Sequence, residues 1–204
     1  MDKLAITSVP INDLAKRRWS PRAFLSKPVE REKIISLFEA ARWSPSGGNE
    51  QPWRYIVGLH PDETWQKIFS TLFEGNQEWN PPVPVLILSV GNKISSWDGN
   101  VSNYFQYDVG QSVAHLTLEA VHQGLHTHQM GGFSPEKARE LFEIPDTHQP
   151  LTVIAVGYMG EPELLSEKLK QREVLERKRK ELSEIVFSGK FGNTSPLVEE
   201  PDIL

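Results

Sequence analysis

The chain has 204 residues and a mass of 23.2 kDa, which suits one domain with a sizeable core. Its net charge of −5 opposes non-specific nucleic-acid binding, and its mean hydropathy of −0.41 and short apolar runs oppose a membrane protein. The absence of cysteine excludes disulfides, thiolate metal sites and cysteine nucleophiles, and with no secretory signal visible at residues 1–10 a cytoplasmic location is expected.

Helix and strand patterns alternate along the chain. Apolar residues at i, i+3, i+4 and i+7 predict a helix over Glu30–Arg42, ended by the Pro- and Gly-rich residues 44–49. Aromatic and β-branched residues predict a strand over Trp53–Leu59, and a near-continuous apolar run predicts a strand buried on both faces at Val83–Val90. Further helices are expected over Pro10–Arg18, Thr64–Phe73, Ser102–Gln123, a segment opening at Ser134, and Glu163–Lys180, with a last strand over Leu151–Tyr158.

Few strands, many helices and no regular βαβ alternation predict an α+β fold. Residues 1–204 are expected to form one domain, in which 188–204 make a C-terminal arm. No G-x-G-x-x-G follows a strand and no G-x-x-x-x-G-K-[ST] occurs, so neither common nucleotide-binding fold is favoured.

Basic side chains gather at two places in this acidic chain. In the first, Arg18, Ser20 and Arg22 alternate, so an extended backbone would turn them to the same side. Two guanidiniums and a hydroxyl suit a phosphate plus a second acceptor, because arginine presents a planar fork of donors. In the second, the run Glu176-Arg177-Lys178-Arg179-Lys180 either stabilises the end of a helix or completes a phosphate clamp with Arg18.

A loop rich in amides lies between the second helix and the first strand. It reads Ser44-Pro45-Ser46-Gly47-Gly48-Asn49-Glu50-Gln51-Pro52-Trp53. Its main-chain amides, with the side chains of Asn49 and Gln51, suit the polar edge of a heterocycle. The alternative is an ordinary helix–strand connection, for which this loop is long.

A second glycine-rich segment, 124–133, follows the longest expected helix. At Gly131-Gly132 a flat ligand can approach the main chain because no Cβ intervenes. The nearby histidines His122, His126 and His128 are interpreted as an exposed or hydrogen-bonded cluster. A metal site is disfavoured, because a glycine breaks the helix among them and no acidic ligands complete the set.

In combination these motifs resemble the nitroreductase family. The spacing of Arg-x-Ser-x-Arg-x-Phe and the later Pro-Ser-Gly-Gly-Asn-x-Gln-Pro-Trp carries the resemblance. The Gly-Leu after the central helix, the Gly-Gly turn and the Arg-Lys-Arg run before Leu182-Ser183-Glu184-Ile185-Val186 give looser support. The resemblance covers nearly the whole chain, from about Arg17 to Gly192.

The resemblance implies a homodimer of α+β subunits, each with a central, mostly antiparallel sheet flanked by helices, and FMN in two clefts at the dimer interface. NADH or NADPH would be the cosubstrate, and hydride would pass to an electron-poor acceptor such as a nitroaromatic or quinone in ping-pong turnover. The expected partners are a small-molecule substrate and a second copy of the chain. No catalytic side chain and no metal are expected, because the chemistry belongs to flavin N5.

The resemblance also implies the cofactor-binding residues. One group of side chains would bind the FMN phosphate, and Arg22 would act as an electrostatic tuner at the N1/C2-carbonyl edge of the flavin. The partner subunit would line the flavin ring, and the Gly-Gly turn would lie near N5. Trp19 is expected among the cofactor-binding residues too, although it departs from the small or basic residue more usual beside Arg18. The residues that would hold the phosphate are Arg18, Ser20, Arg177 and Arg179; the partner's residues are Pro45, Ser46 and Asn49; those near N5 are Met130, Gly131 and Gly132, and Gln129 is a further cofactor-binding residue.

Two alternatives stay open. A specialised flavin reductase, such as a reductive dehalogenase or an enoate-type reductase, would place a lid residue at the substrate, for which Phe73–Asn80 is a candidate. A flavin-binding sensor or store without turnover would show no bleaching by NAD(P)H.

Overall fold

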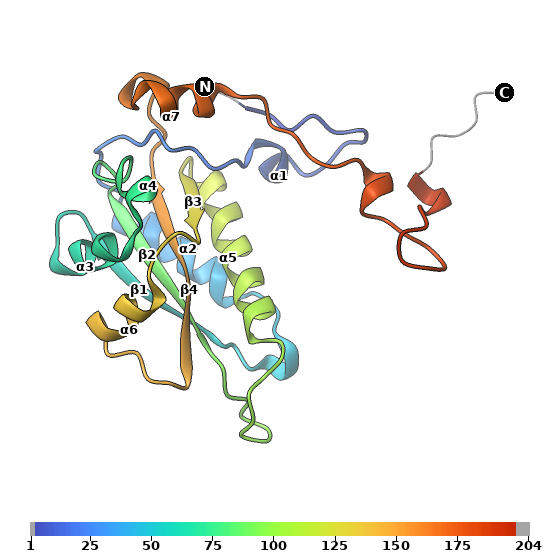
Figure 1. The fold of residues 1–204 in the computed structure, drawn as a ribbon, viewed down its shortest axis with the longest axis horizontal. Coiled ribbons are helices and arrows are strands. Elements are labelled where there is room, and N and C mark those ends of the chain that lie inside the picture. The colour runs from blue at the N-terminus through green and yellow to red at the C-terminus, as the bar shows by residue number, and fades with distance from the viewer. Residues whose placement is uncertain (1–2, 199–204) are drawn as a thin grey trace.

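The computed structural model describes residues 3–198, which build a sheet covered by helices on both faces (Figure 1). The sheet is antiparallel throughout, in the order β1-β2-β4-β3. Its strands are β1 (Trp53–Leu59), β2 (Val85–Asn92), β3 (His126–Met130) and β4 (His148–Gly157). The α-helices are α1 (Asp13–Arg17), α2 (Arg31–Arg42), α3 (Glu63–Thr71), α4 (Glu74–Gln77), α5 (Phe105–His122), α6 (Pro135–Leu141) and α7 (Glu167–Val174).

Strand β2 shows why the core has two layers. Its alternate side chains are buried on opposite faces, as the period of a strand requires. Val85 and Ile87 join one cluster with α2 and α5, whereas Leu86 and Leu88 join another with α3 and α6. The strand buried on both faces is therefore confirmed, and so is the α+β fold.

Most expected elements form close to their predicted bounds, and β1 has the bounds that the sequence predicts. The helix expected over Glu163–Lys180 is wrong beyond Val174, where α7 ends. Leu175 already has extended dihedrals, φ −57° and ψ 142°. The physical reason is packing: α7 rests on the core through Leu169, and Leu175 is exposed, so no apolar face supports a further turn.

The glycine-rich segment 124–133 also differs from a plain loop, because it contains β3. The sequence His-Thr-His-Gln-Met of this strand is polar and gives no clear strand pattern. Its backbone is ordered by pairing with β4, from His126 opposite Gly157 to Met130 opposite Val153. Tertiary pairing overrides a weak local preference here.

After α7 the chain runs beside the N-terminal segment and then away from the helices and sheet (Figure 1). Short 3₁₀ turns at Leu182–Glu184 and Pro196–Val198 flank a bridge between Phe187 and Thr194. Part of the expected arm, 199–204, lies outside the described residues. Within residues 3–198 no helix is long and apolar enough to cross a membrane.

Candidate functional site

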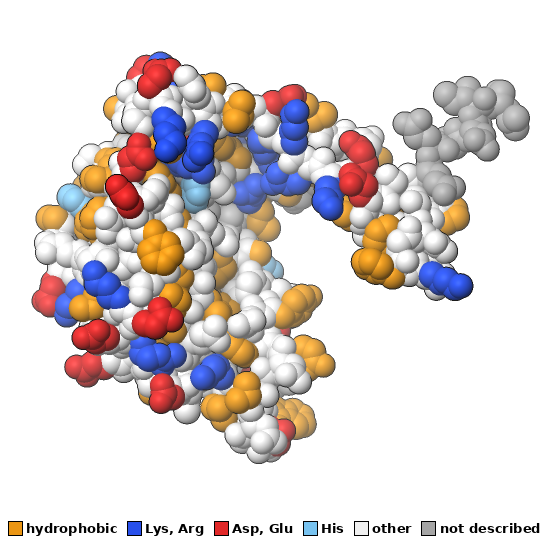
Figure 2. Space-filling model, in the orientation of Figure 1, with side chains coloured by type: hydrophobic (Ala, Val, Ile, Leu, Met, Phe, Trp, Pro, Cys, Tyr) orange, Lys and Arg blue, Asp and Glu red, His pale blue; other side chains and the backbone are white. Residues whose placement is uncertain are grey.

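The two basic clusters come together at one end of the molecule. Arg177 donates through Nη1 to the main-chain oxygens of Lys3, at 2.6 Å, and Lys16, at 3.0 Å. This joins the segment after α7 to the segment around α1. Figure 2 shows Lys and Arg side chains gathered where these segments meet, at the rim of a hollow beside the body of the molecule.

Three guanidiniums of these segments lie close enough to repel one another. Burial lowers the pKa of Arg18, and the charges of Arg177 and Arg179 lower it further. The pKa of Arg177 is likewise lowered by burial and then by Arg179. Among the described residues no carboxylate lies within 4.0 Å of any of the three. Such a cluster favours a bound anion, because an anion relieves the repulsion.

The other residues of the first motif divide between surface and core. Ser20 stays beside Arg18, whose Nη1 donates to its hydroxyl at 3.3 Å. Trp19 is buried, with the Lys3 ammonium 4.6 Å from its ring centroid and the His126 ring at its edge. Its indole therefore packs against Lys3, whose carbonyl accepts a hydrogen bond from Arg177.

Arg22 has a partner that the sequence does not reveal. Its main-chain amide donates to Oε1 of Glu173 at 2.8 Å, and its Nη1 lies 3.9 Å from Oε2 of the same carboxylate. Arg22 keeps 30% of its side chain exposed, whereas the Glu173 side chain is 2% exposed. The positive charge of Arg22 is thus partly balanced from within the core.

A groove of about 470 Å³ lies between α5, β3 and β4, next to the glycine pair. A Cβ at Gly131 would meet no atom within 4 Å, so the main chain there is open to a ligand. A Cβ at Gly132 would lie 2.8 Å from Nδ2 of Asn76, which donates to the Gly132 carbonyl at 2.9 Å. Gly131 leaves room for a ligand, whereas a side chain at Gly132 would displace the Asn76 amide from its hydrogen bond.

The residues before the glycine pair have partners inside the protein. Met130 is buried, with its sulfur 3.3 Å from Nδ2 of Asn80. Gln129 is exposed and lines the groove, and its Nε2 donates to the Thr117 hydroxyl at 3.2 Å. The structure therefore places Gln129 in the groove and the Met130 side chain in the core.

His128 is held by the motif that carries Arg22. Its Nδ1 donates to the Pro21 carbonyl at 2.8 Å, and its ring centroid lies 4.7 Å from that of Trp79. Burial, and to a smaller extent the nearby charge of Arg22, lower the pKa of His128 to about 4. His128 is therefore neutral at pH 7. Within residues 3–198 no group of three or more His, Asp or Glu side chains is placed to hold a metal ion.

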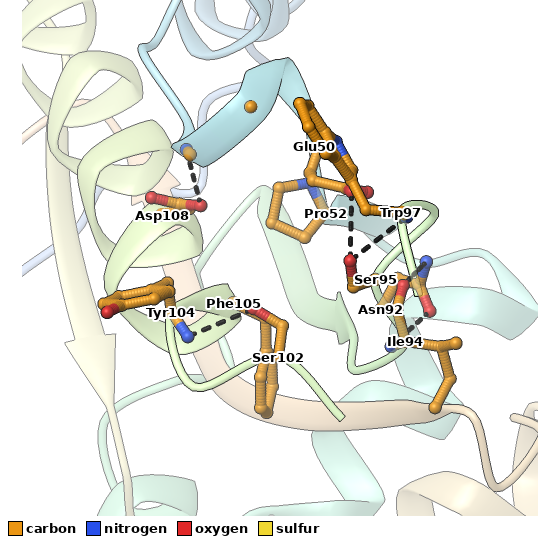
Figure 3. A pocket seen from close by; sticks show the side chains of 12 residues that line it. Glu50, Pro52, Asn92, Ile94, Ser95, Trp97, Ser102, Tyr104, Phe105 and Asp108 are labelled. Atoms are coloured by element: carbon orange, nitrogen blue, oxygen red, sulfur yellow. Dashed lines mark hydrogen bonds between the residues drawn. The ribbon is translucent and has the colours of Figure 1, made fainter. Parts of the chain in front are cut away.

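The amide-rich loop is fixed by the first turn of α5 (Figure 3). The Gly47 amide donates to Oδ2 of the buried Asp108 at 3.1 Å, and the Gln51 amide donates to the Ser46 hydroxyl at 3.0 Å. Gly48, at φ 56°, and Asn49, at φ 58°, adopt the left-handed conformation, which glycine and asparagine tolerate best.

A second cavity, of about 380 Å³, adjoins this loop (Figure 3). Trp97 covers Gly48 so closely that a Cβ there would lie 2.9 Å from the indole Nε1. The Glu50 carboxylate, which also lines the cavity, accepts from the Ser96 amide at 3.0 Å and so ties the loop to the segment that carries Trp97. Asp108 and Glu50 were not predicted, because acidic residues in loops and first helical turns are common and neither carries a distinctive motif.

The loop and the arginine cluster lie at opposite ends of α5. Asp108 is in the first turn of that helix, whereas Trp19, next to Arg18, contacts His126 just beyond the last turn. A helix of 18 residues is about 27 Å long at 1.5 Å per residue. One chain therefore does not bring Pro45, Ser46 and Asn49 to Arg18.

Comparisons with known proteins agree with this architecture. The model of the nitroreductase family matches residues 15–82 and 74–158. An uncharacterised 15.4 kDa protein of Mycolicibacterium smegmatis is 33% identical over 148 residues, which cover 69% of this chain and 98% of that protein. A protein of Archaeoglobus fulgidus named as an NADH dehydrogenase/NAD(P)H nitroreductase is 26% identical over 145 residues, which cover 69% of this chain and 80% of that protein.

Among solved structures, the crystal structure of an oxidoreductase containing FMN superimposes with a TM-score of 0.87 and 31% identity, over 93% of this chain and 96% of that one. The family match spans more than half of the chain, and this fold covers nearly all of it. The chain is therefore an oxidoreductase that belongs to the nitroreductase family.

Proposed function

We propose that this chain binds FMN and transfers hydride from NADH or NADPH to an electron-poor acceptor such as a nitroaromatic or a quinone. The observation that carries the proposal is the convergence of Arg18, Arg177 and Arg179, for which no described carboxylate is an ion-pair partner. A phosphate suits these forks of donors. The relative named for NAD(P)H and the similar structure that contains FMN support the same cofactors.

The residues around the groove fit the rest of a flavin. Gly131 has open space in place of a Cβ, so a flat ring could approach its main chain, and Gln129 lines the same groove. Arg22 would place a cation at the N1/C2-carbonyl edge, and Ser20 would join the phosphate contacts. Bound FMN would supply the hydride chemistry at N5, so no acid–base side chain is required.

The proposed site needs a second copy of the chain. Pro45, Ser46 and Asn49 lie at the end of α5 opposite the arginine cluster, so one chain would not bring them to a phosphate bound there, and we assign them to the partner's contribution. We therefore propose a homodimer with two flavin sites, and light scattering during gel filtration would test it. A mass near 23.2 kDa would contradict the dimer, because that is the mass of one chain.

We further propose that donor and acceptor occupy one pocket in turn and that the protein acts in the cytoplasm, where NAD(P)H is available. Steady-state rates at several fixed acceptor concentrations would then give parallel double-reciprocal lines. Intersecting lines would contradict this order, because they require both reactants to be bound together.

The first experiment is a visible absorption spectrum of the purified protein, before and after anaerobic NADH or NADPH. Flavin bands that bleach with nicotinamide and return on adding a nitroaromatic or quinone would support the proposal. A protein that cannot be reconstituted with FMN would overturn it. A flavin that neither nicotinamide reduces would favour the sensor or store instead.

A further inference from the structure

The buried carboxylate of Glu173 is the least expected group near the site. Glu173 lies one residue before the end of α7 and is 1% exposed, although most of that helix faces solvent. Its Oε1 accepts hydrogen bonds from the amides of Arg22, at 2.8 Å, and Ala23, at 3.1 Å. Its Oε2 has no hydrogen-bond donor among the described residues.

The surroundings of this carboxylate are cationic. The Arg22 guanidinium lies 3.9 Å from Oε2. The Lys3 ammonium donates to the main-chain oxygen of Glu173 at 2.7 Å, and the Lys3 carbonyl accepts from Arg177. Glu173 thus connects the first arginine motif, the N-terminal segment and the second basic cluster.

Two roles for this carboxylate make different demands on its charge. Holding the amides of Arg22 and Ala23 requires only an acceptor oxygen, which a neutral amide side chain also provides. Balancing Arg22 requires the negative charge itself. A buried carboxylate is costly unless it is paired, and charges only 3.9 Å apart beneath the surface are weakly screened by salt.

We propose that Glu173 is a positioning residue that fixes Arg22 and offsets its positive charge, and thereby lowers the reduction potential of flavin bound beside Arg22. This inference rests on the proposed function, because it needs FMN at that place. Its physical basis is that reduction adds negative charge at the N1/C2-carbonyl edge. A cation there favours the reduced flavin, and an anion behind that cation weakens the effect.

The test measures the flavin midpoint potential of Glu173→Gln, which keeps an oxygen for both amides and removes only the charge. We expect the potential to rise. A tenfold change in the equilibrium constant of this two-electron couple would be a shift of about 30 mV. Arg22→Gln should lower the potential, and the double variant should lie between the two single variants. A potential that is unchanged or lower in Glu173→Gln overturns the proposal.

The matched control is Glu167→Gln at the other end of α7. Glu167 is an exposed residue in the first turn of the same helix, and its loss changes the net charge of the chain by the same amount. Its potential should equal that of the wild type. An equal rise in both variants would attribute the shift to net charge and overturn the role of Glu173.

A second comparison covers the case in which Glu173→Gln fails to fold. The Arg22→Gln/Glu173→Gln double variant leaves neither charge without its partner, and its flavin potential should be higher than that of Arg22→Gln, in which the buried carboxylate remains alone. Equal potentials would again overturn the proposal.

A readout without flavin separates the failure of this inference from that of the proposed function. In the flavin-free protein, hydrogen exchange at the amides of Arg22 and Ala23 should be as slow in Glu173→Gln as in the wild type, and faster in Glu173→Ala. Equal exchange in all three overturns the positioning role. If the wild-type protein takes up no FMN, the proposed function is overturned. If it takes up FMN and the midpoint potential of Glu173→Gln equals that of the wild type, this inference alone is overturned.

Discussion

Replacing Arg18 with alanine removes one of the three guanidiniums of the proposed phosphate site. A hydrogen bond to a charged group contributes about 1.5–3 kcal/mol, so the dissociation constant for FMN should rise about 10- to 150-fold. The flavin-free protein should be little affected. Among the described residues the Arg18 guanidinium makes one long hydrogen bond, to Ser20 at 3.3 Å, and its removal relieves repulsion from Arg177 and Arg179.

The assay is titration of flavin-free protein with FMN, followed by quenching of flavin fluorescence. Repeating the titration at higher salt should narrow the difference between wild type and Arg18→Ala, because salt screens the partly exposed charges. Inorganic phosphate should raise the melting temperature of the wild type and should lose this effect in the variant.

The matched control is Arg17→Ala. Arg17 is the adjacent residue, but its guanidinium turns away and pairs with Asp13 at 2.7 Å on the surface of α1. Its loss should cost only the few tenths of a kcal/mol of an exposed i,i+4 pair and leave FMN affinity unchanged. Full flavin occupancy in Arg18→Ala, or an equal loss of affinity in Arg17→Ala, would refute the reasoning.

Three further predictions concern the groove, the loop and pH. Gly131→Ala should leave the free energy of unfolding unchanged but weaken FMN binding several-fold. Gly132→Ala should lower the free energy of unfolding by about 0.5–1.5 kcal/mol, because the Asn76 amide must move and lose its hydrogen bond to the Gly132 carbonyl; urea unfolding and FMN titration of both variants would check this, and the reverse ranking would contradict it. Asp108→Ala should release the Gly47 amide and lower the free energy of unfolding by about 1–3 kcal/mol, with a smaller loss in Asp108→Asn, which keeps an acceptor oxygen. Hydrogen exchange at the Gly47 amide of Asp108→Ala that is as slow as in the wild type would argue against this contact. The pKa of His128 is about 4 in the folded protein and 6.5 in the unfolded chain, so its contribution to the free energy of unfolding is complete above about pH 6.5 and falls by at most about 3 kcal/mol as the pH drops towards 4. Urea unfolding at pH 7 and pH 5 should therefore show a smaller effect of pH in His128→Gln than in the wild type. An equal effect of pH in both proteins would contradict the assignment.

Local patterns were sufficient where burial follows the period of an element. The apolar stripe of α2 and the continuous apolar run of β2 each have one compact arrangement that buries them, so the sequence predicted both. The same reasoning failed at α7, because a run of charged residues compatible with a helix lacks an apolar face beyond Leu169. Likewise, β3 follows from pairing with β4, which no local pattern encodes.

The sequence by itself determined the α+β class, most element bounds and the two arginine motifs with their resemblance to the nitroreductase family. Only the tertiary structure decided that Arg18, Arg177 and Arg179 converge, that Gly131 and not Gly132 leaves open space, and that Glu173 lies behind Arg22. The physical reason is range. Helix and strand periodicity is set within a few residues, whereas the Glu173 carboxylate meets an amide 151 positions away in the chain, and its neighbouring residues give no sign of that contact.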